Sequence, residues 1–276
     1  MEQTQKEVSA HIRNGNFFIQ QVVDVTDTSN IKEAYKQLET KFEECGMNRV
    51  SILLNNAGIV YDDPINSLSV QEVDNTFSVN VISQFSLIST FLPDLMNQRV
   101  ANIVNMSSLI ALVPSSHLSS YSASKAAVRA MSDCLRLDFK ANNNDHIRVT
   151  TICPQFVSTG MFSGSYSKEY LGHRLKNFFF PENSAEDIAK EIVYAIRYEK
   201  DEIILPRLVG FFLPLLQFFP HVITDYLFLF AGGSHGMDCF EGRGKKWNES
   251  RRMERSAKES NVLYDGNTIV YCDIRK

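Results

Sequence analysis

Glycine is scarce in the first part of this chain. Before Gly58 only Gly15 and Gly46 occur, and neither belongs to a glycine-rich pattern. A turn that holds a phosphate group at the start of a helix needs clustered glycines, because its backbone amides must approach the ligand closely. The sequence therefore excludes a phosphate-binding turn of this kind before Gly58.

Metal-binding and disulfide patterns are also lacking. The five cysteines are odd in number, scattered and never spaced as Cys-x-x-Cys, which indicates reduced thiols facing a cytosolic environment. The six histidines are scattered without metal-ligand spacing, so we expect no metal site. The formal net charge is −4 and no long basic stripe occurs, so nothing favours a nucleic-acid partner.

The start of the chain carries no apolar segment. Its first seven residues are polar, so we expect neither a cleavable signal peptide nor an N-terminal anchor in this form. With 276 residues, of which 44% are hydrophobic and 22% charged, the chain is long enough for one large α/β domain and an appendage.

Strand-like and helix-like segments alternate along the chain. We expect strands at residues 17–23, 50–54, 102–106, 147–152 and 203–205. Helices are expected between a capping Asn30 and Gly46, from Ser69 through Asn80 towards Leu95, at residues 120–140, and from Ser184 to Tyr198. This alternation predicts a parallel, doubly wound sheet of the α/β class.

Tyr121 and Lys125 stand one helical turn apart and therefore lie on the same helix face. A free tyrosine titrates near pH ~10, so it serves as an acid or base at neutral pH only when its phenolate is favoured. A cation within ~4 to 6 Å in a partly desolvated site lowers that pKa by ~2 to 3 units. Taken alone, the pair is also compatible with a helix that carries a Tyr and a Lys without chemical purpose.

The segments upstream decide between these interpretations. Ser108 ends an expected strand thirteen residues before Tyr121. The run Asn55-Asn56-Ala57-Gly58 closes the preceding strand, and Asn80 lies in the helix after it. At this point the chain resembles the short-chain dehydrogenase/reductase family. The family's Asn-Asn-Ala-Gly element and its Asn, Ser, Tyr and Lys tetrad match these residues in order and spacing.

The resemblance implies reversible hydride transfer between a nicotinamide cofactor, NAD or NADP, and an alcohol or carbonyl. Tyr121 would exchange the hydroxyl proton, Lys125 would stabilise its phenolate and bind the nicotinamide ribose, and Ser108 would hold the substrate oxygen. Asn80 would position a water that passes the proton towards Lys125, although by itself it could be a helix-surface amide. Ser107 is expected to be an ordinary strand-end hydroxyl.

Further residues are expected from the resemblance to contact the cofactor. They are Asp24, Asn55, Ala57, Gly58, Pro154 and Thr159, in addition to Tyr121 and Lys125. Asp24 would contact the adenine, with a strand-end turn residue as the alternative. Gln155 stands where many members of the family have glycine. That departure is shared in type by the branch containing the epidermal retinal dehydrogenases and the lipid-droplet 17-beta-hydroxysteroid dehydrogenases, whose carboxyl-terminal element residues 235–240 also resemble.

The family's first strand, glycine-rich turn and first helix have no counterpart here. The resemblance implies that the chain starts inside the second helix of a Rossmann-like fold, so that residues 1–205 form an incomplete, N-terminally truncated dehydrogenase domain. In the usual strand order 3-2-1-4-5-6, the lost pair lies between residues 17–23 and 50–54 and leaves a gap in the sheet. The residue that selects NAD or NADP follows the second strand, so both cofactors stay open.

Residues 206–245 are strongly apolar without forming a clean membrane span. A span needs ~20 uncharged residues, whereas Pro214, Gln217 and Pro220 interrupt this segment before Asp225. We expect attachment to a membrane surface, with Arg207 and the basic residues between 243 and 246 meeting anionic headgroups. A buried subdomain over the substrate mouth is the alternative. The polar tail, residues 246–276, resembles nothing in the family.

These features together favour an NAD(P)-dependent oxidoreductase that interconverts a lipophilic alcohol and carbonyl, such as a retinoid or steroid. The expected location is the cytosolic face of the endoplasmic reticulum membrane or a lipid droplet. The helices from Ser69 and Ser120 are those that relatives use to dimerise, so a homodimer is a further expectation. The alternative is a catalytically silent fragment that acts only as a membrane-bound or dimerising protein.

Overall fold

The computed structural model describes residues 19, 21–46, 49–61, 63–155, 183–216 and 218–230. Its strands are β1 (Ile52–Asn55), β2 (Ala101–Met106), β3 (Ile147–Cys153) and β4 (Glu202–Ile204). Its longer helices are α2 (Thr28–Cys45), α3 (Val70–Phe77), α4 (Ser83–Met96), α5 (Ser119–Ala141), α7 (Ala185–Arg197), α8 (Arg207–Leu216) and α9 (His221–Phe230). A π-turn (Ser78–Ile82) joins α3 to α4, and a 3₁₀ turn (Leu109–Ala111) follows β2.

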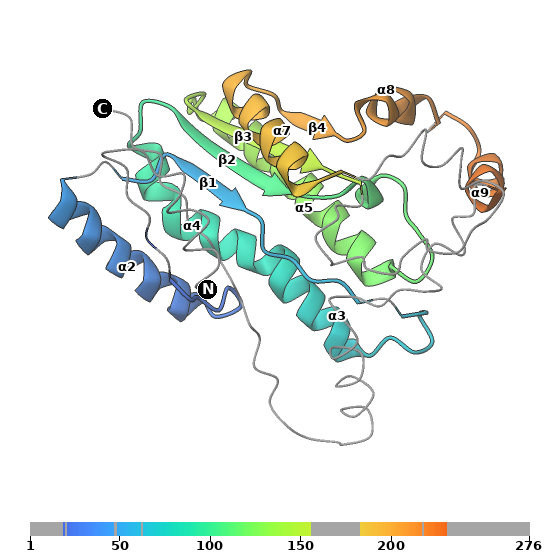
Figure 1. The fold of residues 1–276 in the computed structure, drawn as a ribbon, viewed down its shortest axis with the longest axis horizontal. Coiled ribbons are helices and arrows are strands. Elements are labelled where there is room, and N and C mark those ends of the chain that lie inside the picture. The colour runs from blue at the N-terminus through green and yellow to red at the C-terminus, as the bar shows by residue number, and fades with distance from the viewer. Residues whose placement is uncertain are drawn as a thin grey trace.

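The strands form one parallel sheet in the order β1-β2-β3-β4 (Figure 1). In the register of the first pair, Asn55 lies opposite Asn105. Because all the ladders are parallel, the carboxyl ends of the strands meet at one edge of the sheet. The predicted α/β class is therefore confirmed, and the end of each strand supplies residues to the same edge.

Helices cover both faces of this sheet (Figure 1). Ile103 and Val104 are neighbours in β2 and point to opposite faces, since side chains alternate along a strand. Ile103 belongs to a core shared with α2, α4 and α5, whereas Val104 packs in a second core against α7, through Ile188 and Ala195. Both side chains are fully buried, as is typical of a parallel strand that helices cover on both faces.

Helix α2 begins one turn earlier than the sequence predicted. Its N-cap is Asp27, not Asn30, and the Asp27 side chain accepts hydrogen bonds from the backbone N–H groups of Ser29 and Asn30. The Asp27 carboxylate, three residues before Asn30, is a stronger acceptor for the backbone N–H groups of the first turn than the Asn30 amide would be. The predicted end is confirmed, because Gly46 adopts a left-handed conformation with φ of 60°.

The strand predicted at residues 17–23 is not formed in the part of this segment that the structure describes. Residues 19 and 21–23 lie in no ladder. Val23 and Val25 are nevertheless buried in the core beneath α2. The physical reason is that a strand needs a hydrogen-bonding neighbour, and the strands expected beside this one have no counterpart in the sequence. The apolar pattern of this segment predicted its burial correctly but did not predict whether it pairs with another strand.

The helix predicted from Ser69 towards Leu95 is formed, with one interruption. Ser69 and Glu72 make the reciprocal capping box that the sequence predicted. After α3 the chain enters the π-turn, in which the Ser83 backbone N–H bonds the carbonyl of Ser78, and then continues as α4. A single π-turn of this kind is often found at a functional site.

The apolar segment after β4 forms two short helices. Gly210 in α8 lies so close to β4 that an added Cβ would stand 2.9 Å from the Cβ of Ile204. Leu213 is buried in the same contact. Arg207, at the start of α8, bonds the carboxylate of Glu191 and lies 4.4 Å above the ring of Tyr194. These contacts hold α8 against β4 and α7.

Candidate active site

The expected tetrad comes together where the parallel strands end. Ser108 follows β2, Asn80 sits in the π-turn, and Tyr121 and Lys125 lie in the first two turns of α5. All four side chains are buried, with exposed fractions between 0% for Asn80 and 9% for Ser108. Ligands of open α/β sheets bind at this end of the strands.

Tyr121 and Ser108 interact directly. A hydrogen bond with the Ser108 side chain favours ionisation of the Tyr121 phenol, while burial acts more strongly and raises the Tyr121 pKa above its ordinary value. The Ser108 hydroxyl also lies 3.3 Å from the carbonyl of Pro154, which fixes the turn after β2 to the end of β3. Pro154 is thus at the site, through its backbone.

Lys125 lies beside the tyrosine without bonding to it. Its Nζ is 5.7 Å from the centre of the Tyr121 ring and donates a 2.8 Å hydrogen bond to the carbonyl of Met106. Burial lowers the pKa of Lys125 to about 8. The sequence led us to expect that Lys125 lowers the Tyr121 pKa. In the structure burial raises the Tyr121 pKa instead, because the phenol has lost its contact with water and the Lys125 ammonium faces a carbonyl.

Asn80 clamps the loop that follows β1. Its Oδ1 accepts a 2.8 Å hydrogen bond from the backbone N–H of Ile59, and its Nδ2 donates to the Ile59 carbonyl at 3.0 Å. Nδ2 also donates to the Ser124 hydroxyl at 3.0 Å. The helix-surface alternative for Asn80 is wrong, since the side chain is fully buried.

Two serines support this arrangement. Ser107 donates a 2.8 Å hydrogen bond to the carbonyl of Lys125 and so ties the end of β2 to α5. Ser124, which sequence reasoning missed, donates to the carbonyl of Tyr121 at 2.7 Å while accepting from Asn80. Its place three residues after Tyr121 was the signal, because that spacing returns it to the same helix face.

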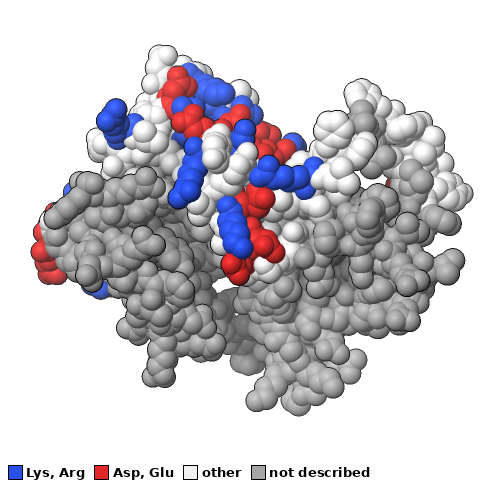
Figure 2. All heavy atoms as spheres, turned by 45° about the horizontal axis from the view of Figure 1, so that its top comes forward, with Lys and Arg blue, Asp and Glu red and all other residues white. Residues whose placement is uncertain are grey.

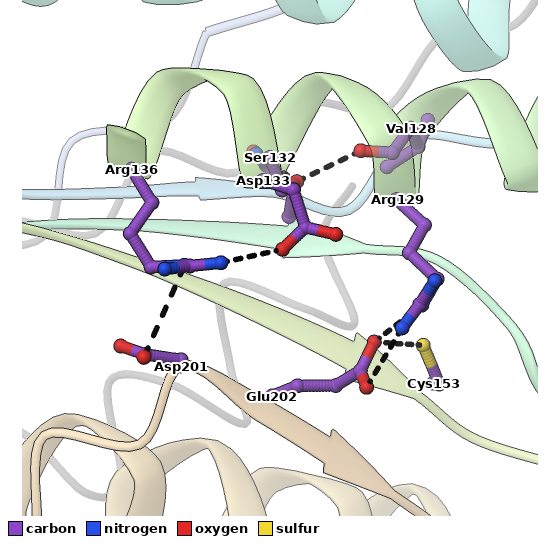
Figure 3. Close-up of polar contacts among 9 residues, drawn as sticks. Val128, Arg129, Ser132, Asp133, Arg136, Cys153, Asp201 and Glu202 are labelled. Carbon is purple, nitrogen blue, oxygen red and sulfur yellow. Dashed lines mark hydrogen bonds and ion pairs between the residues drawn. The ribbon is translucent and has the colours of Figure 1, made fainter. Parts of the chain in front are cut away.

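Farther along α5, ion pairs fasten the helix to the sheet (Figure 3). Arg129, one turn after Lys125, makes a two-pronged contact with Glu202 of β4, with distances of 2.6 and 3.2 Å. Buried Cys153 in β3 points its sulfur at the same carboxylate. The Arg129–Glu202 ion pair holds α5, which carries Tyr121 and Lys125, in position relative to the strands.

The remaining expected cofactor contacts have mixed positions. Asp24 is half-buried and its carboxylate accepts from the backbone N–H and hydroxyl of Thr26, as in a turn that leads into α2. Asn55 ends β1 and donates from its amide to Asn105. Thr159 lies outside the described residues. The structure therefore places Asn55 at the strand ends that hold the tetrad, whereas the Asp24 carboxylate is bound within its own turn.

Chemically, this edge holds a buried acid–base pair with a hydroxyl beside it. Residues 1–170 match the family described as short chain dehydrogenase. The chain belongs to this family. The family predicted from the sequence is thereby confirmed.

Individual members of the short-chain dehydrogenase family resemble the chain at moderate identity. Short-chain dehydrogenase/reductase family 16C member 6 of Bos taurus is 31% identical over 212 residues, which cover 77% of this chain and 63% of that protein. Human 17-beta-hydroxysteroid dehydrogenase 13 is 28% identical over 196 residues, or 71% and 61% of the two chains. Retinol dehydrogenase 10-B of Xenopus laevis is 27% identical over 220 residues, or 80% and 62%. The chain thus spans about three fifths of the length of these relatives.

The residues present fit one end of a nicotinamide cofactor. Because Gly58 has no side chain, a ligand can approach its backbone between Asn80 and Lys125. A Cβ added at Gly58 would fill this space, since it would lie 3.5 Å from Asn80 Oδ1 and from Lys125 Nζ. Several buried side-chain oxygens along this edge have no hydrogen-bond partner among the described residues, namely those of Asn55, Ser120, Ser122 and Gln155. Such oxygens suit a polar ligand. For the pyrophosphate the sequence offers no glycine-rich turn, so the fit is limited to the nicotinamide ribose.

Proposed function

We propose that this protein is an oxidoreductase that uses NAD or NADP to interconvert a lipophilic alcohol and the corresponding carbonyl. One observation supports this best: Ser108, Tyr121 and Lys125 meet in a buried site at the carboxyl edge of the parallel sheet. Membership of the short-chain dehydrogenase family and the dehydrogenase names of the relatives support the same reaction class. The nicotinamide, when bound, supplies the hydride chemistry.

The chain's own residues would manage the proton. Tyr121 would give a proton to the carbonyl oxygen or take one from the hydroxyl, and Ser108 would hold that oxygen by a hydrogen bond. Lys125 would contribute positive charge beside the phenol once a bound ligand excludes water, because electrostatic attraction strengthens in a dry site. Asn80 would keep the backbone at Ile59 in place and position the water of the proton path.

The substrate class follows from the relatives and from the surface. Relatives named for retinol and for 17-beta-hydroxysteroids support a lipid alcohol. Helices α8 and α9 follow the same edge of the sheet as the site, and they expose Phe211 at 72% and Tyr226 at 71%, while Phe218 in the turn between them is exposed at 85%. Figure 2 shows mostly uncharged atoms on that side, next to a face of mixed charge over α7.

We infer that α8 and α9 rest on a lipid surface, either the cytosolic face of the endoplasmic reticulum membrane or a lipid droplet. None of the helices in the described part of the chain combines the length and apolar character needed to cross a bilayer. Arg207 is already neutralised by Glu191, so attachment would depend on the apolar side chains more than on this cation. We also propose that the dehydrogenase domain ends after residue 205, between β4 and α8. A homodimer that forms through the α4 and α5 side is a further proposal.

A second candidate function is a catalytically silent protein that only dimerises or binds lipid. The observation that favours it is the lack of a glycine-rich turn before Gly58. Binding of NAD or NADP that Lys125→Ala abolishes separates the two candidates, because a silent protein binds no nicotinamide at its tetrad.

The test of the reaction is Tyr121→Phe in a form of the protein that carries a complete cofactor site. The change removes the proton-transfer oxygen and keeps the ring, so folding should survive while turnover of a retinol or hydroxysteroid falls by at least ~100-fold. Ser108→Ala should cost substantial rate.

Ser107→Ala is the matched control, because Ser107 is an adjacent buried serine whose hydroxyl bonds the carbonyl of Lys125 and the Cys153 thiol. It should lower the melting temperature modestly and leave the rate nearly unchanged. Near-normal turnover of Tyr121→Phe, or a larger rate loss for Ser107→Ala than for Ser108→Ala, would refute the assignment.

A further inference from the structure

The π-turn that carries Asn80 is held by two side chains from the start of α4. The Ser83 hydroxyl donates a 2.6 Å hydrogen bond to the carbonyl of Val79, and Gln84 Nε2 donates a 3.0 Å hydrogen bond to the carbonyl of Asn80. A π-turn displaces carbonyls from the regular helical ladder, so side-chain donors can take the place of backbone ones. Asn80 is thus held at its main chain by Gln84 and at its side chain by Ile59 and Ser124.

Gln84 keeps its other polar atom buried without a partner. Its side chain is 1% exposed, and its Oε1 meets no hydrogen-bond donor among the described residues. A buried amide oxygen left in this condition costs stability, and an apolar side chain of the same volume would avoid that cost. Buried oxygens of this kind normally bind an internal water, which needs two to four polar partners.

We propose that Gln84 is a positioning residue of this site, which holds Asn80 through its amide nitrogen and binds an internal water with its amide oxygen. The inference rests on the proposed function only where it assigns a role in the reaction to Asn80. The hydrogen bond between Gln84 and Asn80 is a property of the folded chain, whether or not the protein is active. Through Asn80 the effect reaches the backbone of Ile59, next to Gly58, where an added Cβ would stand 3.5 Å from Lys125 Nζ.

The Ile59 amide proton reports this role directly, because its hydrogen bond ends on Asn80 Oδ1. Gln84→Met removes both polar atoms at similar volume and good helix propensity. We expect the Ile59 amide signal to shift and its hydrogen exchange to accelerate about tenfold or more, since local protection follows the strength of the bond. Asn80→Ala, which removes the acceptor, should produce the same change.

Ser83→Ala is the matched control. It removes a bond to the neighbouring carbonyl in the same π-turn and touches neither Asn80 nor Ile59. If Gln84 is merely structural, Ser83→Ala and Gln84→Met will change Ile59 exchange equally, and the proposal is overturned. An unchanged Ile59 amide in Gln84→Met overturns it as well. Neither outcome depends on activity, so a silent protein could still confirm the positioning role.

The unaltered protein gives a second measurement, which is decisive even if Gln84→Met fails to fold. A crystal structure at high resolution should contain an ordered water within about 3.2 Å of Gln84 Oε1. Finding that oxygen without water or any other donor would reject the internal-water site. Finding Gln84 turned away from the Asn80 carbonyl would reject the positioning role.

Discussion

At the scale of single residues, Lys125 is the side chain whose placement costs the most. Its ammonium is 3% exposed and has one described hydrogen bond, to the Met106 carbonyl. Burial lowers its pKa to about 8 from 10.5. The unfolded chain therefore holds the proton more tightly than the folded one between these values, and folding stability must rise with pH across that window. A protein optimised only for stability would place an apolar side chain here.

We predict that Lys125→Met stabilises the protein at pH 7 by about 1 to 3 kcal/mol, because the variant no longer buries a charge. The gain over the unaltered protein should be complete below pH 8 and should shrink as the pH rises towards 10.5. Urea unfolding of both proteins at several pH values measures this difference. The raised pKa values of Tyr121 and Cys153 weaken folding at high pH in both proteins, and Lys125→Met raises the Cys153 pKa further because it removes a nearby positive charge, so the comparison is made at or below pH 9. A gain independent of pH would contradict the burial argument.

At the scale of elements, one buried carboxylate joins the helical layer to the sheet. Asp94 of α4 is fully buried and accepts hydrogen bonds from the Tyr35 hydroxyl at 2.9 Å and from the backbone N–H of Val50 at 3.3 Å. It also pairs with Arg49, which bonds Glu39 at the surface. The cluster therefore connects α2, α4 and the segment entering β1, on the side where the sheet has lost its expected neighbours.

We predict that Asp94→Asn lowers the free energy of unfolding by about 1 to 3 kcal/mol, because it weakens a buried, charge-assisted network while keeping its shape. Glu39→Gln is the control. It breaks an exposed pair to the same Arg49 and should cost less than about 1 kcal/mol. Chemical denaturation measures both. Equal losses would mean that Asp94 contributes no more than a surface ion pair.

The elements also show what the sequence could and could not predict. The helix starts at Ser69 and Ser184 and the glycine after α2 have local chemical causes, and these predictions are confirmed. The tetrad could be proposed because its spacing is fixed by one strand and one helix. Gln84 could not, since its role depends on the π-turn, and for Ser124 the spacing from Tyr121 indicates only a shared helix face and not the bond to Asn80, which lies 44 residues away in the chain. Local pattern does not encode such contacts.

At the scale of the whole molecule, the described sheet is one half of a doubly wound fold. Its order runs from β1 to β4 without reversal, so the point where strand order would reverse lies outside these strands. In the described residues β1 has β2 as its partner on one side and no strand on the other. Among the described residues, 21–23 and β1 form no ladder with each other. A parallel strand edge without a partner strand is a site at which another chain can pair.

The same half-fold leads to the last prediction, which concerns cofactor affinity. The tetrad side can hold the nicotinamide ribose, but the pyrophosphate must be bound without a glycine-rich turn. Each charge-assisted hydrogen bond lost there is worth about 1.5 to 3 kcal/mol, and every ~1.4 kcal/mol is tenfold in affinity. We expect this 276-residue chain to bind NAD and NADP several powers of ten more weakly than a relative with the complete turn. Titration calorimetry of both proteins tests this, and Lys125→Ala should remove whatever binding remains. Micromolar binding by the chain would show that some other segment supplies the pyrophosphate contacts.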